Sequence, residues 1–239
     1  MTIDHTGYVI YPDNYWFRFA GRLSFPIFCF LIVQGFLHTK DDPKRIGKYL
    51  LRLGLFALIS EVPFDKCFHH VTLEYQSQNV FITLFLGLLA LYGLEKLDEY
   101  YLGFVPPIIA LFLSYWMKSD YSYLGIFMIF GFYAIEVCCD DDKKKAMALF
   151  AIITVFVCGE LIKGKANYQE VYDTFCEKRW FYLGTYFAII PLMMYNGERG
   201  FKNKWLKLAF YAYYPAHLLV LNHFYVPYET QLLLKVLGE

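Results

Sequence analysis

The sequence predicts an all-α fold, a polytopic bundle of transmembrane helices that forms one domain over residues 1–239. The chain is 58% hydrophobic with a positive mean hydropathy, whereas soluble domains are nearer ~45–50% apolar. Aromatic residues reach 21%, which suits rings packed between helices and gathered at membrane interfaces. Apolar runs also alternate with short polar breaks. Because backbone groups in lipid must be paired within the segment, these runs are expected to be helices.

About nine spans are expected, the first of them shortened. The eight complete runs are Tyr15–Phe36, Tyr49–Val62, Asn79–Leu94, Tyr101–Met117, Tyr123–Val137, Ala146–Ile162, Phe181–Met194 and Trp205–Phe224. Several are nearer 15 residues than 20, so short or tilted spans are expected. The opening run, Met1–Tyr11, has about half the length needed to cross a bilayer. We expect either a half-span or about ten further apolar residues upstream in the natural protein.

The Lys and Arg residues between the runs predict the orientation, because cytoplasmic loops carry an excess of both. Alternate breaks, starting after Phe36, hold thirteen of them: Lys40, Lys44, Arg45, Lys48, Arg52, Lys96, Lys143, Lys144, Lys145, Arg199, Lys202, Lys204 and Lys207. The other breaks and the tail hold seven: Lys66, Lys118, Lys163, Lys165, Lys178, Arg179 and Lys235. The first set is predicted to be cytoplasmic, with the N-terminus in the cytoplasm and the C-terminus outside.

Composition also narrows the partners. Basic and acidic residues balance at 22 each, so the net charge indicates no nucleic-acid partner. The six Cys residues have no metal-ligand spacing, so no metal is expected. The lipid bilayer is the one partner that composition predicts directly.

Ionisable residues within the first two apolar runs are the main functional signal. Asp4, His5, Arg18 and Arg22 lie where the hydrocarbon region would be, and such residues mark functional sites unless they only pair with one another. Pro12-Asp13-Asn14 forms a compact turn, so the two helices should be neighbours and His5 and Arg22 should meet at similar depth. The alternative is an interhelical ion-pair network, which for Arg18 is favoured slightly because Arg snorkels.

Pairing within this group follows from helix geometry. Asp4 and His5 are consecutive, so they point about 100° apart and do not form a dyad with each other. Asp4 is expected to pair with Arg18 or Arg22. Glu61, from another helix, is the expected carboxylate partner that orients His5.

Further polar residues are candidates for substrate binding, each with a structural alternative. His217 follows Pro215 in mid-span and either faces the pocket or bonds a freed carbonyl. Asn79 and Asp120 either bind an acceptor or cap helices. Asn196 and Arg199 lie in a glycine-containing loop. This loop is able to contact a phosphorylated ligand through its backbone N–H groups and cations.

Several ordered motifs make the chain resemble the TraX family of integral membrane proteins, which is associated with N-terminal acetylation of conjugative pilin. The motifs are Ile3–His5, Gly21–Phe28, Gly35–Thr39, Tyr49–Leu53, Ser60–Phe64, Tyr195–Gly200 and Tyr211–His217. The resemblance covers nearly the whole chain. It implies a bacterial inner-membrane acyltransferase that uses cytoplasmic acetyl-CoA, with its intramembrane His at His5.

The mechanism expected from this resemblance is direct acetyl transfer. Lys44, Arg45 and Arg199 would attract the acetyl-CoA phosphates, and His5 would take the proton of an amine or hydroxyl on a protein or glycan acceptor. Arg22 would stabilise the oxyanion. Two alternatives are a transporter or channel with a relay through Asp4, Arg22 and His217, and a non-catalytic assembly factor for a surface polymer.

Overall fold

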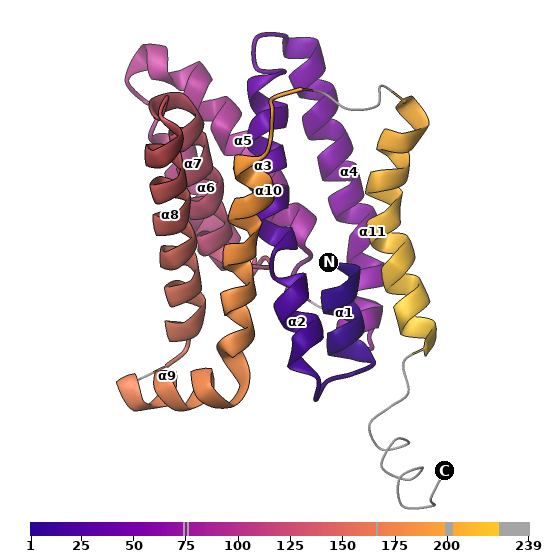
Figure 1. Cartoon of the computed structure of the whole chain (residues 1–239). Helices are drawn as coiled ribbons and strands as arrows, with labels where there is room; N and C mark the ends of the chain where they lie inside the picture. Colours follow the sequence, from indigo (N-terminus) through magenta and orange to yellow (C-terminus); the bar gives the residue numbers. More distant parts are fainter. Residues whose placement is uncertain (74, 76, 166, 199–202, 225–239) are drawn as a thin grey trace, which may run out of the picture.

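The computed structural model describes residues 1–73, 75, 77–165, 167–198 and 203–224. In this part of the chain the α-helices are α1 Thr2–Val9, α2 Tyr15–Gly21, α3 Ser24–Leu37, α4 Pro43–Phe68, α5 Val80–Leu97, α6 Val105–Trp116, α7 Ser122–Cys138, α8 Asp142–Ile162, α9 Tyr168–Thr174, α10 Ile189–Met193 and α11 Lys204–Phe224. Shorter helical turns are η1 Asp98–Tyr100, η2 Phe175–Arg179 and η3 Trp180–Ala188. Figure 1 shows these helices running mostly side by side, so the all-α prediction is confirmed.

Within the described residues, three helical segments are long and apolar enough to cross a membrane: Tyr15–Leu37, Val80–Tyr100 and Asp142–Ile162. Val105–Trp116, Ser122–Cys138 and Trp180–Met193 are apolar but shorter. The predicted count of nine spans is therefore not confirmed by length and composition. The outward surface is nevertheless apolar, as on α4, where Leu51, Leu55 and Leu58 are all exposed. The chain is an integral membrane protein whose lipid-facing side chains lie along the outside of the bundle.

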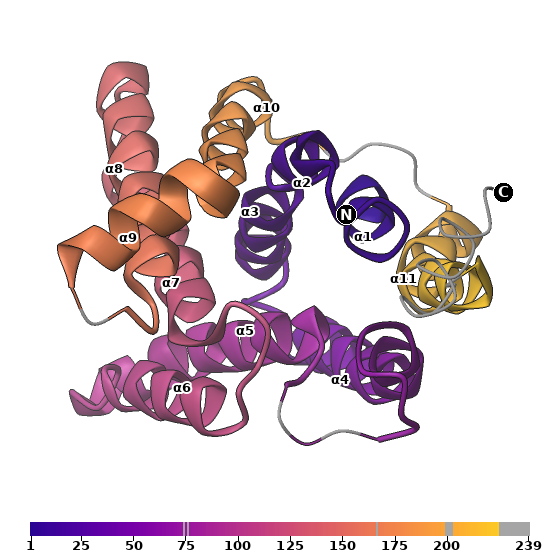
Figure 2. The same cartoon turned by 90° about the horizontal axis from the view of Figure 1, so that it is seen from below.

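Helix α3 lies inside the bundle. It packs against α5, α7 and η3, and Figure 2 shows it between the α1–α2 pair and the helices on the far side. Its side chains Cys29, Val33 and Phe36 are completely buried. Helix α3 therefore meets protein on most of its sides.

The expected continuous span Tyr15–Phe36 is broken at Arg22 and Leu23, between α2 and α3. Pro26 has no N–H to donate to the carbonyl of Arg22, and its ring crowds that carbonyl. The Ser24 hydroxyl donates instead to the Gly21 carbonyl, at 2.7 Å. The interruption presents Arg22 at a change of helix direction, where its side chain reaches inward.

Helices α1 and α2 form a short hairpin. Asn14 caps α2, its side-chain oxygen accepting from the Trp16 N–H at 3.2 Å. Gly21 lets α1 approach closely, because a Cβ at that position would lie 2.2 Å from the Asp4 Cβ. At about 1.5 Å per residue the eight residues of α1 span about 12 Å, and Figure 1 shows the N-terminus near mid-height of the bundle. The opening run thus forms a helix of eight residues, Thr2–Val9.

The helix ends that flank the four breaks predicted to be rich in Lys and Arg lie together at one end of the bundle. The C-terminal ends of α3, α5, α7 and α10 lie at the upper end in Figure 1, and α4, α8 and α11 begin there. We call this the basic end. The α1–α2 turn and α9 lie at the opposite end. The helices therefore alternate in direction, as the predicted orientation requires. The assignment of the basic end to the cytoplasm stays a prediction.

Candidate functional site

Asp4 forms an ion-pair cluster with both arginines of the hairpin. Arg22 Nη2 donates to Asp4 Oδ1 at 2.8 Å and to Oδ2 at 2.7 Å, and Arg18 Nε lies 2.9 Å from Oδ1. The Arg18 N–H does not point at that oxygen, so this second contact is an ion pair without a hydrogen bond. Asp4 was expected to pair with one arginine or the other and pairs with both, which offsets the cost of burying three charges.

One donor of Arg22 is left without a partner. Its Nη1 donates to the Tyr121 hydroxyl at 3.0 Å, and Nη2 is used by Asp4, but Nε is buried and makes no hydrogen bond in the described structure. The guanidinium also packs against the rings of Phe181 and Tyr182, 5.2 Å from each centroid. Arg22 is thus fixed in place by three helical elements while keeping one N–H for another acceptor.

His5 points away from Asp4, as the 100° offset predicted, and meets His217 of α11. The His5 Nδ1 and His217 Nε2 atoms are 2.9 Å apart, and both side chains are buried. Phe68 of α4 and Tyr214 of α11 contact the His5 ring edge-on. His217 Nδ1 lies 2.9 Å from the Tyr213 carbonyl oxygen. His217 therefore does both things that the sequence left open: it faces the site and bonds a backbone carbonyl of its own helix.

A polar pocket of about 280 Å³ opens beside these groups. Its charged and imidazole side chains come from the hairpin, α4, α8 and the loop before α7, and are Asp4, His5, Arg18, Arg22, His69, Asp120, Glu160 and Lys163. The pocket volume is near the lower limit for small-molecule sites, which are about 300–1,000 Å³.

Two carboxylates in this pocket make no ion pair with the part of the chain that the structure describes. The Asp120 side chain makes no hydrogen bond or ion pair with the described residues, and burial raises its pKa to about 7 although Arg22 opposes the shift. Glu160 accepts from the Tyr182 hydroxyl at 3.0 Å through Oε2, while its buried Oε1 has no partner. The polar pocket thus offers two kinds of group to a ligand: the carboxylate oxygens of Asp120 and Glu160 as acceptors, and the Arg22 Nε–H as a donor.

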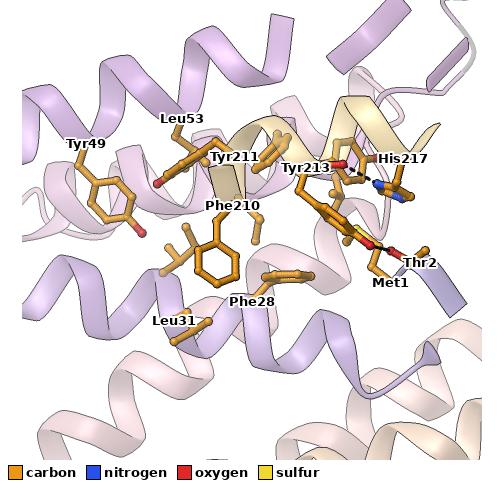
Figure 3. A pocket seen from close by; sticks show the side chains of 15 residues that line it. Met1, Thr2, Phe28, Leu31, Tyr49, Leu53, Phe210, Tyr211, Tyr213 and His217 are labelled. Carbon is orange, nitrogen blue, oxygen red and sulfur yellow. Dashed lines mark hydrogen bonds between the residues drawn. The ribbon is translucent and has the colours of Figure 1, made fainter. Parts of the chain in front are cut away.

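An apolar cavity of about 470 Å³ lies on the other side of His217. Its lining comes from α3, α4, α5 and α11 and includes Phe28, Leu31, Leu53, Phe210 and Tyr211. Figure 3 shows His217 at one end of this cavity and Tyr49 at the other. Met1 lines both hollows. The His5–His217 pair therefore stands where a polar pocket and an apolar cavity meet.

Comparison with known proteins identifies the family. The family described as TraX protein matches residues 1–224. The chain belongs to the TraX family. It is 26% identical over 237 residues to a probable fimbrial assembly protein FimC, serogroup H1, of Dichelobacter nodosus, covering 92% of this chain and 89% of that protein. It is 29% identical over 161 residues to an uncharacterized protein of Rickettsia prowazekii (strain Madrid E), covering 65% and 57%. No solved structure matches significantly.

The expected pairing of Glu61 with His5 is wrong. His5 contacts Phe68, which is seven residues further along α4, so Glu61 lies about 10 Å away along the helix axis. Glu61 instead accepts a short hydrogen bond from the Asn79 amide. Asn79 is fully buried and caps α5 by accepting from the Phe81 N–H at 2.9 Å. In this TraX chain Asn79 thus caps a helix, one of the two roles expected for it, and Glu61 supports it.

Of the residues expected to bind a phosphorylated ligand, Lys44, Arg45 and Asn196 lie at the basic end, away from His5. Lys44 and Arg45 are exposed at the basic end, where their backbone N–H groups donate to Asp42. Asn196 is also exposed and accepts from the Glu198 N–H. Arg199 lies outside the described residues. These cations could act only on a long ligand that reaches from the basic end to the middle of the bundle.

Sequence reasoning missed Tyr121, Glu160 and Tyr182. Glu160 had a usable signal, because it is an acidic residue at the end of the apolar run Ala146–Ile162 and falls under the same rule that singled out Arg22. The two tyrosines carried no such signal, since they are among 22 in the chain. Their hydroxyls matter only because the fold places them beside Arg22 and Glu160.

Proposed function

We propose that this TraX protein is a membrane acetyltransferase that moves an acetyl group from acetyl-CoA to an amine of a protein acceptor. The observation that carries the proposal is the meeting of His5 and Arg22 in a buried polar pocket that adjoins an apolar cavity. A base and an anion-stabilising donor at one point are what acyl transfer needs. The resemblance to a probable fimbrial assembly protein supports a pilin-like acceptor.

The apolar cavity is the proposed entry of the donor. Its volume of about 470 Å³ is within the range of sites that hold small molecules. On α4 it reaches Tyr49, which is four residues, or about 6 Å, from Arg45 at the basic end. A donor whose phosphates contact Lys44 and Arg45 would therefore extend its acyl end toward His217. This role requires the basic end to be cytoplasmic, in the inner membrane of a bacterium.

The polar pocket is the proposed acceptor site, and its unpaired carboxylates favour an amine over a hydroxyl. An ammonium group is a triple hydrogen-bond donor with no acceptor, so Asp120 and Glu160 together would satisfy it. A glycan hydroxyl carries no positive charge and would leave both carboxylates without a cation. The acceptor would bind as the ammonium and give one proton to the Asp120 carboxylate before it reacts as the neutral amine.

The reaction step follows from these positions. The neutral amine nitrogen attacks the thioester carbonyl carbon, and His5 takes the proton that the nitrogen loses. The C–S bond then breaks, and the departing thiolate of coenzyme A takes up that proton. The unpaired Nε–H of Arg22 would donate to the oxyanion. Loss of one such donor typically lowers kcat by about 10²–10³-fold.

The test is acetyl-CoA consumption by the purified protein in detergent, with a pilin-like peptide that carries a free N-terminus. His5→Gln and Arg22→Lys should each abolish or strongly reduce turnover while the fold persists. His223→Gln is the matched control, because His223 is exposed near the end of α11. Turnover that survives in His5→Gln would refute the assignment of the base. Absence of any acetyl-CoA binding or turnover in the wild type would favour transport or assembly instead.

A further inference from the structure

The hydrogen bonds around His217 determine which of its ring nitrogens carries a proton. His217 Nδ1 lies 2.9 Å from the Tyr213 carbonyl oxygen, and a carbonyl only accepts, so Nδ1–H is the donor. A neutral imidazole has one N–H. The other nitrogen, Nε2, is therefore an acceptor in neutral His217.

The same reasoning then fixes the tautomer of His5. His5 Nδ1 lies 2.9 Å from His217 Nε2, so His5 Nδ1–H must donate to it. His5 Nε2 is left with its lone pair, and it makes no hydrogen bond in the described part of the chain. His5 lines the polar pocket, and Phe68 and Tyr214 pack against its ring. The imidazole is thus held by one hydrogen bond and two aromatic contacts.

We infer that His217 is a positioning residue that holds His5 in the Nδ1–H tautomer and so leaves Nε2 as the proton acceptor of the site. This inference rests on the proposed acyl transfer. When Nε2 takes the proton of the acceptor, His5 Nδ1–H continues to donate to His217, and the imidazolium keeps its partner. A hydrogen bond to the far nitrogen of a reacting His is a general way to set its tautomer and orientation.

The choice of a second histidine has a physical reason. Asp4 is taken by the two arginines, and another buried carboxylate would add a further charge at membrane depth, which is costly. A neutral imidazole supplies the acceptor without that charge. The Tyr213 carbonyl fixes the partner from its own helix, so no further side chain is needed.

The experiment reads the tautomer directly and does not depend on turnover. Protein labelled with ¹⁵N-His is studied by NMR in detergent, and the His5 signals among the six His residues are assigned from a His5→Gln sample. The wild type should show a proton on His5 Nδ1 and none on Nε2. His217→Leu should lose this preference, whereas His217→Gln should keep it, because the Gln side chain can accept from His5 and donate to Tyr213. His223→Gln should match the wild type.

Acetyl transfer gives the second readout. His217→Leu should lower turnover by about 10–100-fold, by analogy with the loss of the hydrogen-bond partner of a metal-ligating His, and His217→Gln should recover most of it. A wild-type His5 protonated on Nε2 would overturn the inference, as would an unchanged tautomer in His217→Leu or an equal loss of turnover in both variants. If the wild type shows the predicted tautomer and no turnover, the proposed function fails while the hydrogen-bond assignment stands.

Discussion

Removing the Asp4 carboxylate should strongly destabilise the hairpin. Asp4→Ala leaves Arg22, which is 6% exposed, without its anionic partner and deletes two charge-assisted hydrogen bonds of 2.7 and 2.8 Å. Such bonds contribute about 1.5–3 kcal/mol each, and breaking a buried ion pair by removing one partner costs about 3–5 kcal/mol. Arg18 adds less, since its side chain is 18% exposed and partly screened by solvent. We expect a loss of about 3–5 kcal/mol in the free energy of unfolding.

The assay is unfolding by sodium dodecyl sulfate in mixed micelles, with tryptophan fluorescence as the signal. A double variant, Asp4→Leu with Arg22→Met, is the informative comparison, because replacing both members of a buried ion pair with apolar groups is often neutral or stabilising. The double variant should therefore recover most of the stability and none of the acetyl transfer. If Asp4→Ala costs less than about 1 kcal/mol, the size expected of an exposed pair, the view of Asp4 as a buried counter-ion is refuted.

Three further outcomes test other parts of the site. Gly21→Ala should push α1 off α2, since its Cβ would overlap Asp4, costing about 1–3 kcal/mol in the same unfolding assay, with activity lost. The affinity for an alkylamine that stays protonated should rise about tenfold from pH 6 to pH 8, because the Asp120 carboxyl, with its pKa of about 7, ionises over this range. Calorimetry measures this affinity, and Asp120→Asn should bind the amine equally well at both pH values. Leu31→Trp, at the apolar cavity, should raise the KM for acetyl-CoA, whereas Leu58→Trp on the exposed face should not.

Much of the fold was predictable because a bilayer restricts the choices. The ranges of the apolar runs agree with most helices to within a few residues, as for Ala146–Ile162 within α8. The break at Arg22 was missed, although Pro26 was a visible signal for it. The number of spans could not be settled, because short apolar helices satisfy their own backbone hydrogen bonds whether they cross the membrane or pack inside the bundle.

The candidate site was predictable in part. The sequence brought Asp4, His5 and Arg22 together, because they flank one tight turn and so share a depth. It misplaced Glu61, since the depth at which α4 meets His5 depends on how far α4 is shifted along α1: His5 contacts Phe68, two helical turns beyond Glu61. It left the role of His217 open, because more than 200 residues separate it from His5.

The sequence by itself determined the class of the protein and the identity of its costly residues. Hydrophobicity sets which segments enter lipid, and any ionisable group among them is conspicuous because burying it there is expensive. Only the tertiary structure decided the partners. Packing of α11 against α1 and α4 makes the His5–His217 hydrogen bond, and the loop before α7 carries Asp120 to the same pocket. Hydrogen bonds act over about 3 Å, and no pattern along the chain specifies distances on that scale between remote helices.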